Sequence, residues 1–197
     1  MSLVTVEALV QYAQEQDRIA ALGVLHTLCQ QSVNTRSLDE LAGLLRAPLE
    51  QWCPGQEIEA LDRCLAGLPE YEAALAVAYA EAMARAAGRS DIKGVYCEYF
   101  FDGSEGCAAD LFLCRAFSRE DDDWAANFAH EDVIGGPDVD GLLGFDPDLV
   151  WALAPAFVAD AYAHVLLLRG FVRAVAVGPS SLLPVGFAQH DRQIVYL

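Results

Sequence analysis

The segment SREDDDWAANFAHEDVIGGPDVDGLLGFDPD, Ser118 to Asp148, carries ten carboxylates and a single basic side chain, Arg119. Carboxylates at this density can bind a divalent cation, contact a basic partner, or keep a surface solvated. Ten acids minus one base give this segment a charge of −9, out of −17 for the whole chain. This segment is therefore the first candidate for a binding or catalytic site.

Part of the segment has the spacing of a calcium-binding loop. Asp138 and Asp140 precede Gly141, as the early ligands of an EF-hand loop precede its glycine. The first and twelfth positions of such a loop would fall on Gly136 and Pro147, which offer no side-chain oxygen. This excludes an EF-hand loop. An irregular site stays open as an alternative, built from the remaining carboxylates: Asp138, Asp140, Asp146 and Asp148.

Other enzyme signatures are missing from the sequence. His130 precedes Glu131 and Asp132, but neighbours in sequence seldom converge on one metal. His26 and Cys29 share the apolar face of an expected helix and fit a protein core better. There is no HExxH, CxxC, GxSxG or P-loop motif. We predict no cofactor and no metal, with a metal-dependent hydrolase using the carboxylates of 130–148 as the alternative.

Glu98 is a carboxylate inside the apolar and aromatic stretch VYCEYFF. Asp110 lies near the start of the strand expected to return beside it. A carboxylate in such a place must be paired, solvated at an edge, or functional, because burial without a partner is costly. We expect a solvated edge or an arginine partner, with Arg115 as the candidate. A catalytic Glu98 is the alternative.

Residues 1–92 are predicted to be helical, because apolar side chains recur at helical spacing. Ser37 begins a capping box that opens a helix towards Trp52, and Pro48 is expected to break that helix early. Pro69 suits the first turn of the last helix in this portion, and Gly88 suits its end.

The sheet-containing portion, residues 93–197, is predicted to hold a small antiparallel sheet. β-Formers are dense in a central hairpin at 94–117, and a C-terminal hairpin follows at 183–197. A long helix is expected near 155–176. The central hairpin is apolar at nearly every position, which indicates that it is covered on both faces. The fold class is therefore α+β, in a single domain over 1–197.

Composition limits the partners and the compartment. A net charge of −17 with one lysine, Lys93, opposes binding to nucleic acid and to anionic membranes. His164, Arg169 and Arg173 interrupt the most apolar segment, which argues against a membrane span. The six cysteines and the absence of a signal-peptide pattern predict reduced thiols and a cytoplasmic location.

Aromatic side chains lie among the carboxylates of the acidic segment: Trp124, Phe128 and Phe145. Aromatic anchors inside a charged rim are typical of protein interfaces. We predict that a basic protein partner meets these residues, with Trp124 as the apolar anchor: Asp121, Asp122, Asp123, Trp124, Glu131 and Asp132. In the alternative, the aspartates cap a short helix whose Trp124 and Phe128 belong to the core.

In composition and organisation the chain resembles bacterial toxin-immunity proteins. The resemblance implies a small acidic protein that inhibits a basic partner by occluding it, with charge complementarity speeding association. A homo-oligomeric scaffold, with the helical portion as its interface, is a further alternative.

Overall fold

The computed structural model describes residues 4–52, 56–100, 108–139, 142, 154–180, 182–190 and 192–197. The chain divides into two compact units, each made from two stretches of sequence. Unit 1 comprises residues 1–67 and 141–169, and unit 2 comprises residues 68–140 and 170–197. The α+β fold class is confirmed, whereas a single domain over 1–197 stays a prediction.

Unit 1 is helical, as its apolar periodicity predicts. Its helices bury leucines at helical spacing, including Leu9, Leu25 and Leu45, which are at most 2% exposed. The N-terminal part of a long helix, α8, also belongs to this unit. The helices have these bounds: α1 Val6–Gln14, α2 Arg18–Thr35, α3 Leu38–Trp52, α4 Gln56–Leu65 and α8 Ala154–Val177.

Pro48 does not end α3 early, and that prediction is wrong. The helix begins at Leu38, directly after Ser37, and continues through Pro48 to Trp52. A proline inside a helix removes one hydrogen bond and crowds the carbonyl one turn earlier. Leu45 and Leu49, on either side of Pro48, are at most 1% exposed. Burial of this apolar face offsets the free-energy cost of the lost hydrogen bond and the crowding at Pro48, so the helix stays continuous.

Unit 2 begins with helix α5, Leu68–Ala86. Pro69 lies in its first turn, and Gly88 follows its end with a φ of 77°, a conformation that glycine adopts without strain. One stripe of the helix is buried, as its spacing predicts. The stripe consists of these residues: Tyr71, Leu75, Ala78, Ala82 and Met83.

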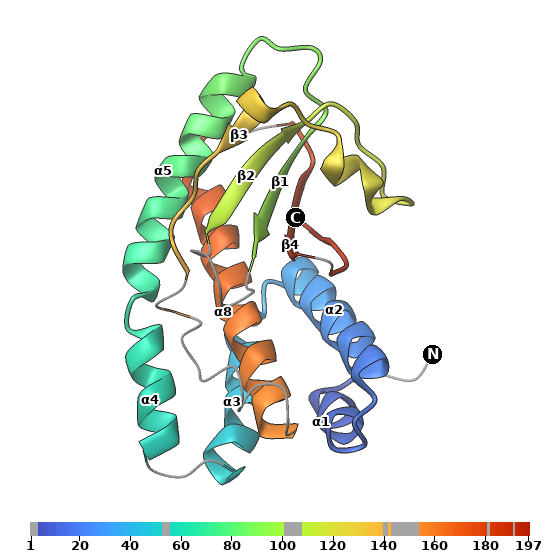
Figure 1. The fold of residues 1–197 in the computed structure, drawn as a ribbon, viewed down its shortest axis with the longest axis vertical. Helices are drawn as coiled ribbons and strands as arrows, with labels where there is room; N and C mark the ends of the chain where they lie inside the picture. The colour runs from blue at the N-terminus through green and yellow to red at the C-terminus, as the bar shows by residue number, and fades with distance from the viewer. Residues whose placement is uncertain are drawn as a thin grey trace. The chain divides into compact units, whose positions relative to one another are not determined.

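The sheet of unit 2 has five strands in the order β3-β2-β1-β4-β5. Figure 1 shows α5 running alongside it. The central hairpin supplies β1 and β2, and the C-terminal hairpin supplies β4 and β5. The strands have these bounds: β1 Gly94–Tyr99, β2 Ala109–Cys114, β3 Val133–Ile134, β4 Val185–Gln189 and β5 Val195–Tyr196.

The sheet is mixed rather than antiparallel, which corrects the sequence-based prediction. β1 pairs antiparallel with β2 but parallel with β4, with Val95 opposite Val185 and Tyr99 opposite Gln189. The two hairpins were both predicted, but their relative direction depends on how distant segments pair. Composition within each hairpin carries no information about that direction.

The two faces of the sheet have different covers. On one face Phe187 stacks with Phe171 of α8 at 5.4 Å between ring centroids, and Tyr79 of α5 packs edge-on against Phe171. The opposite face carries Tyr96 and Cys114, which belong to a second buried cluster. The hairpin is therefore covered on both faces, as its apolar composition predicts.

Candidate partner-binding surface

The acidic segment supplies the cover of the second sheet face. It forms two short 3₁₀ helices, η1 Asp122–Ala126 and η2 His130–Asp132. Trp124 in η1 is only 3% exposed and packs against Tyr96 and Phe117, at 6.0 and 5.1 Å between ring centroids. The segment therefore turns its largest aromatic side chain inward and lies against the sheet.

Two glycines make room for the indole of Trp124. A Cβ atom on Gly94 would lie 2.9 Å from Trp124 Cζ3, and one on Gly186 would lie 3.3 Å from Trp124 Cζ2. Gly94 is on β1 and Gly186 is on the neighbouring β4. A side chain on Gly94 would occupy the space of the indole, so Gly94 is required for this close approach. A Cβ atom on Gly186 would first meet Ile194 Cγ2 at 2.7 Å and would crowd the indole less.

A chain of hydrogen bonds fixes η1 to the end of the sheet. Trp124 Nε1 donates to the Tyr196 hydroxyl at 3.2 Å, and that hydroxyl donates to Asp122 Oδ1 at 2.8 Å. Asp122 also accepts from the backbone N–H of Ile194 at 3.4 Å. Burial raises the pKa of Tyr196, and the neighbouring Asp122 carboxylate raises it further. The phenol therefore stays protonated and available as a donor at neutral pH.

Two arginines hold η2 through Asp132. The Asp132 side chain is 3% exposed and forms ion pairs with Arg89, which follows α5, and with Arg115, which follows β2. Arg89 Nη2 lies 3.2 Å and Arg115 Nη2 lies 3.0 Å from Asp132 Oδ2. Hydrogen bonding to Arg89, aided by Arg115, holds the pKa of Asp132 below its usual range although burial opposes this shift.

Replacing Asp132 by asparagine is expected to lower the free energy of unfolding by about 1–2 kcal/mol at neutral pH, because charge-assisted hydrogen bonds are lost. The folded-state pKa of Asp132 lies below its unfolded value. Its contribution is therefore complete above about pH 4 and is lost as the pH falls through the folded-state pKa. Thermal unfolding from pH 7 to pH 2 should show the two proteins converging under acid. Asp123→Asn, on an exposed carboxylate, is the control, and an equal loss in both variants would contradict the prediction.

Several carboxylates of the segment point to solvent. Glu120, Asp121 and Asp123 are exposed, and the Glu131 side chain is 76% exposed. Asp121 also caps η1, because its side chain accepts from the N–H of Asp123 at 3.0 Å. Phe128 is 38% exposed and packs on Phe112 of β2. We call Glu120, Asp121, Asp123, Phe128 and Glu131 the acidic ridge.

The structure separates the six predicted contact residues into three groups. Asp121, Asp123 and Glu131 lie on the acidic ridge. Asp122 is exposed but is bound by Tyr196. Trp124 and Asp132 are buried inside the protein, so the segment combines the expected charged surface with the helix-capping alternative. Phe145 lies outside the described residues.

Sequence reasoning missed Arg89 as a partner of Asp132. The two residues are 43 positions apart. No local spacing connects them. The sequence shows that Arg89 directly follows Gly88 at the end of α5, but this position does not indicate which carboxylate Arg89 contacts.

Glu98 is not paired with Arg115, so the expected arginine partner is wrong, while its side chain is 23% exposed. Glu98 Oε1 accepts from the Tyr96 hydroxyl at 3.0 Å and lies 3.2 Å from His190 Nδ1. Arg115 contacts Asp132 instead. A carboxylate hydrogen-bonded at Nδ1 orients an imidazole ring. Burial, with the adjacent Glu98, raises the pKa of Tyr96.

Asp110 lies directly opposite Glu98 on β2. Its carboxylate accepts from the N–H of Gly136 at 2.9 Å, so it holds the chain that leads out of β3. This bond gives Asp110 a structural role beside the pair formed by Glu98 and His190.

The metal-binding alternative depends mostly on residues outside the described ranges: Asp140, Asp146 and Asp148. Asp138 and His130 are described, and both are exposed. Within the described ranges, no three His, Cys, Asp or Glu side chains converge as a metal site.

The described cysteines are free thiols: Cys29, Cys64, Cys97 and Cys114. Burial raises the pKa of Cys114 to about 12 and also raises the pKa of Cys97. Thiols with such raised pKa values are almost entirely protonated at neutral pH, and they behave as small hydrophobic side chains. Cys53 and Cys107 lie outside the described residues.

Helix α8 is the one described helix that is long and apolar enough to cross a membrane, over Pro155–Val177. Of the apolar 18-residue window within it, 67% is buried inside the protein.

The comparisons with known proteins find no relatives. The chain matches no protein-family model, and no curated protein or solved structure is significantly similar to it.

Proposed function

We propose that this chain is a cytoplasmic binding protein that occupies a basic protein partner through its acidic ridge, in the manner of toxin-immunity proteins. The observation that carries the proposal is the anchoring of the ridge. Trp124 and Asp132 turn inward and fix η1 and η2, while Asp121, Asp123 and Glu131 face solvent.

Anchoring matters because ordering a flexible loop on binding costs free energy. A segment already held by a buried indole and by ion pairs to the buried Asp132 carboxylate presents its other carboxylates in a fixed arrangement. Lysine and arginine side chains of a partner would meet preorganised acceptors. The local negative potential would also steer the two proteins together and raise the association rate.

Phe128 supplies the apolar part of the ridge. Its ring lies 4.5 Å from that of Phe112 between centroids, and its residue is 38% exposed. An aromatic side chain held against a strand at the edge of a charged surface is a suitable anchor, since interfaces combine a few aromatic contacts with a polar rim. Phe128 therefore takes the role that the sequence suggested for Trp124.

The test compares two variants of equal charge. Asp121→Asn/Asp123→Asn/Glu131→Gln neutralises the ridge, and asparagine keeps the capping ability of position 121. Glu15→Gln/Glu59→Gln/Glu70→Gln removes three exposed carboxylates elsewhere. Each protein is used as bait in lysate of the native host, at low and at moderate salt.

The proposal predicts a basic protein that is retained by the original chain and by the control but lost, or bound at least about tenfold more weakly, by the ridge variant. Raising the salt should weaken its binding, because exposed charges are screened. Identical sets of proteins from all three baits would contradict a role of the ridge.

A further inference from the structure

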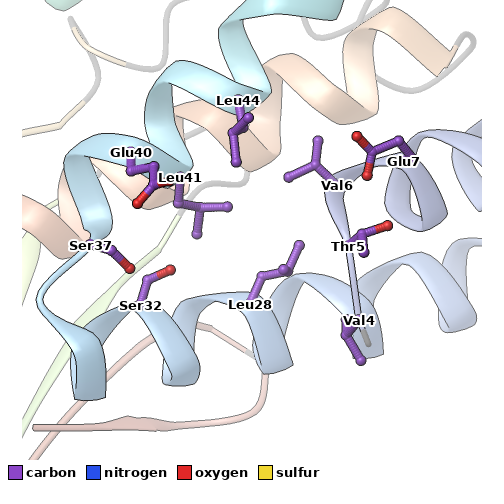
Figure 2. Close-up of a pocket in the computed structure, with 10 residues that line it drawn as sticks. All are labelled: Val4, Thr5, Val6, Glu7, Leu28, Ser32, Ser37, Glu40, Leu41 and Leu44. Atoms are coloured by element: carbon purple, nitrogen blue, oxygen red, sulfur yellow. The ribbon is translucent and has the colours of Figure 1, made fainter. Parts of the chain in front are cut away.

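Unit 1 contains a groove between α1, α2 and α3, with a volume of about 260 Å³. Figure 2 shows its lining side chains. The aliphatic side chains of Val6, Leu28, Leu41 and Leu44 face its middle. Leu44 is 51% exposed although it is a large apolar residue. The groove therefore exposes apolar surface to solvent, as ligand-binding grooves do.

One end of the groove is polar. Figure 2 shows Ser32, Ser37 and Glu40 gathered at the same end, opposite Thr5 and Glu7. None of the ten residues that line the groove is basic. Among the described lining residues, the only formal charges are the carboxylates of Glu7 and Glu40, so the groove is electrostatically suited to a cation.

Ser32 points to a ligand independently of the charges. The residue is 8% exposed, and its hydroxyl is directed towards the groove. Among the described residues, its hydroxyl makes no hydrogen bond, whereas Ser37 Oγ lies 2.7 Å from Thr35 Oγ1. A hydroxyl that faces a groove and has no partner among the described residues is placed to bond with whatever fills the groove.

We infer that this groove binds a short primary aliphatic amine in its ammonium form. The ammonium group has three donors and no acceptor, which matches the hydroxyl of Ser32 and the carboxylate of Glu40. The alkyl chain lies along Leu28 and Leu41 and covers Leu44. The volume is below the range of drug-sized sites, which limits the ligand to a short chain. This inference is independent of the acidic ridge and of the proposed partner.

The test is a titration of the full chain with n-pentylammonium chloride, followed by ¹H–¹⁵N NMR. We expect saturable shifts at groove residues with a dissociation constant on the order of millimolar, as suits so small a ligand. Pentanoate has the same chain length and the opposite charge, and should cause no saturable shift there. Equal binding of the two compounds, or shifts that do not centre on the groove, would overturn the inference.

Two substitutions separate binding from folding. Ser32→Ala should weaken pentylammonium binding about fivefold and leave the melting temperature unchanged, because the hydroxyl bonds to no described residue. Glu40→Gln should weaken binding about tenfold. Glu59→Gln removes an exposed carboxylate from α4, outside the groove, and should change the affinity less than about twofold. Equal effects of Glu40→Gln and Glu59→Gln would also overturn the inference.

Discussion

Trp124→Ala is expected to lower the free energy of unfolding by about 3–5 kcal/mol, the range measured when a buried tryptophan or phenylalanine is truncated. Trp124 is 3% exposed and contacts aromatic rings on three sides: Tyr96, Phe117 and Tyr196. Its removal leaves a cavity over Gly94 and Gly186, which have no side chains to fill it. The hydroxyl of Tyr196 also loses its donor.

Urea unfolding followed by circular dichroism measures this loss. Phe128→Ala is the matched control, because Phe128 lies in the same segment but is 38% exposed, and it should cost much less than Trp124→Ala. A loss below about 1 kcal/mol for Trp124→Ala would contradict the inward anchoring of the acidic segment, and with it the basis of the proposed function.

Gly136→Ala is expected to cost about 3 kcal/mol, at the upper end of the usual penalty for overpacking. A Cβ atom on Gly136 would lie 1.6 Å from the carbonyl oxygen of Ala109, which is a backbone atom of β2. The backbone must separate at this point. That movement breaks two hydrogen bonds, from Gly136 N to Asp110 and from Ala109 N to Pro137 O, both 2.9 Å long.

Gly135 provides a control one residue earlier. No atom lies within 4 Å of a Cβ atom placed on Gly135, so Gly135→Ala should change the stability by less than about 0.5 kcal/mol. Thermal and urea unfolding of the two variants side by side measures the difference. Equal stabilities would show that the segment leaving β3 does not run against β2 as described.

The helices were predictable because their signals are local. Pro69 and Gly88 bound α5 in the sequence as they do in the structure, and Tyr71 and Leu75 lie on its buried face. Capping, turn chemistry and periodicity act within a few residues, so they can be recognised from a short stretch. Pro48 is the exception, because tertiary burial of α3 outweighed the local signal.

The candidate surface was predictable only in part. The charge of the acidic segment follows directly from its composition. Asp121 caps η1, as its position before a short helix suggests. The inward direction of Trp124 was not predictable, because it depends on the space beside Gly94 and Gly186, which are far apart in the sequence and lie on strands that pair with each other. The partner of Glu98 was missed for the same reason, since His190 lies beyond the end of β4.

The parallel pairing of β1 with β4 has a consequence for how the protein is made. As the chain leaves the ribosome, the β1–β2 hairpin emerges well before β4. Until β4 is made, the edge of β1 that pairs with it has unpaired backbone hydrogen-bonding groups. Pairing between strands far apart in the sequence is slow, and an unpaired strand edge can associate with other chains. Tyr196 and Gly186, which contact the indole of Trp124, are made after β1, β2 and η1. The indole therefore gains its full set of contacts only after β4 and β5 have joined the sheet.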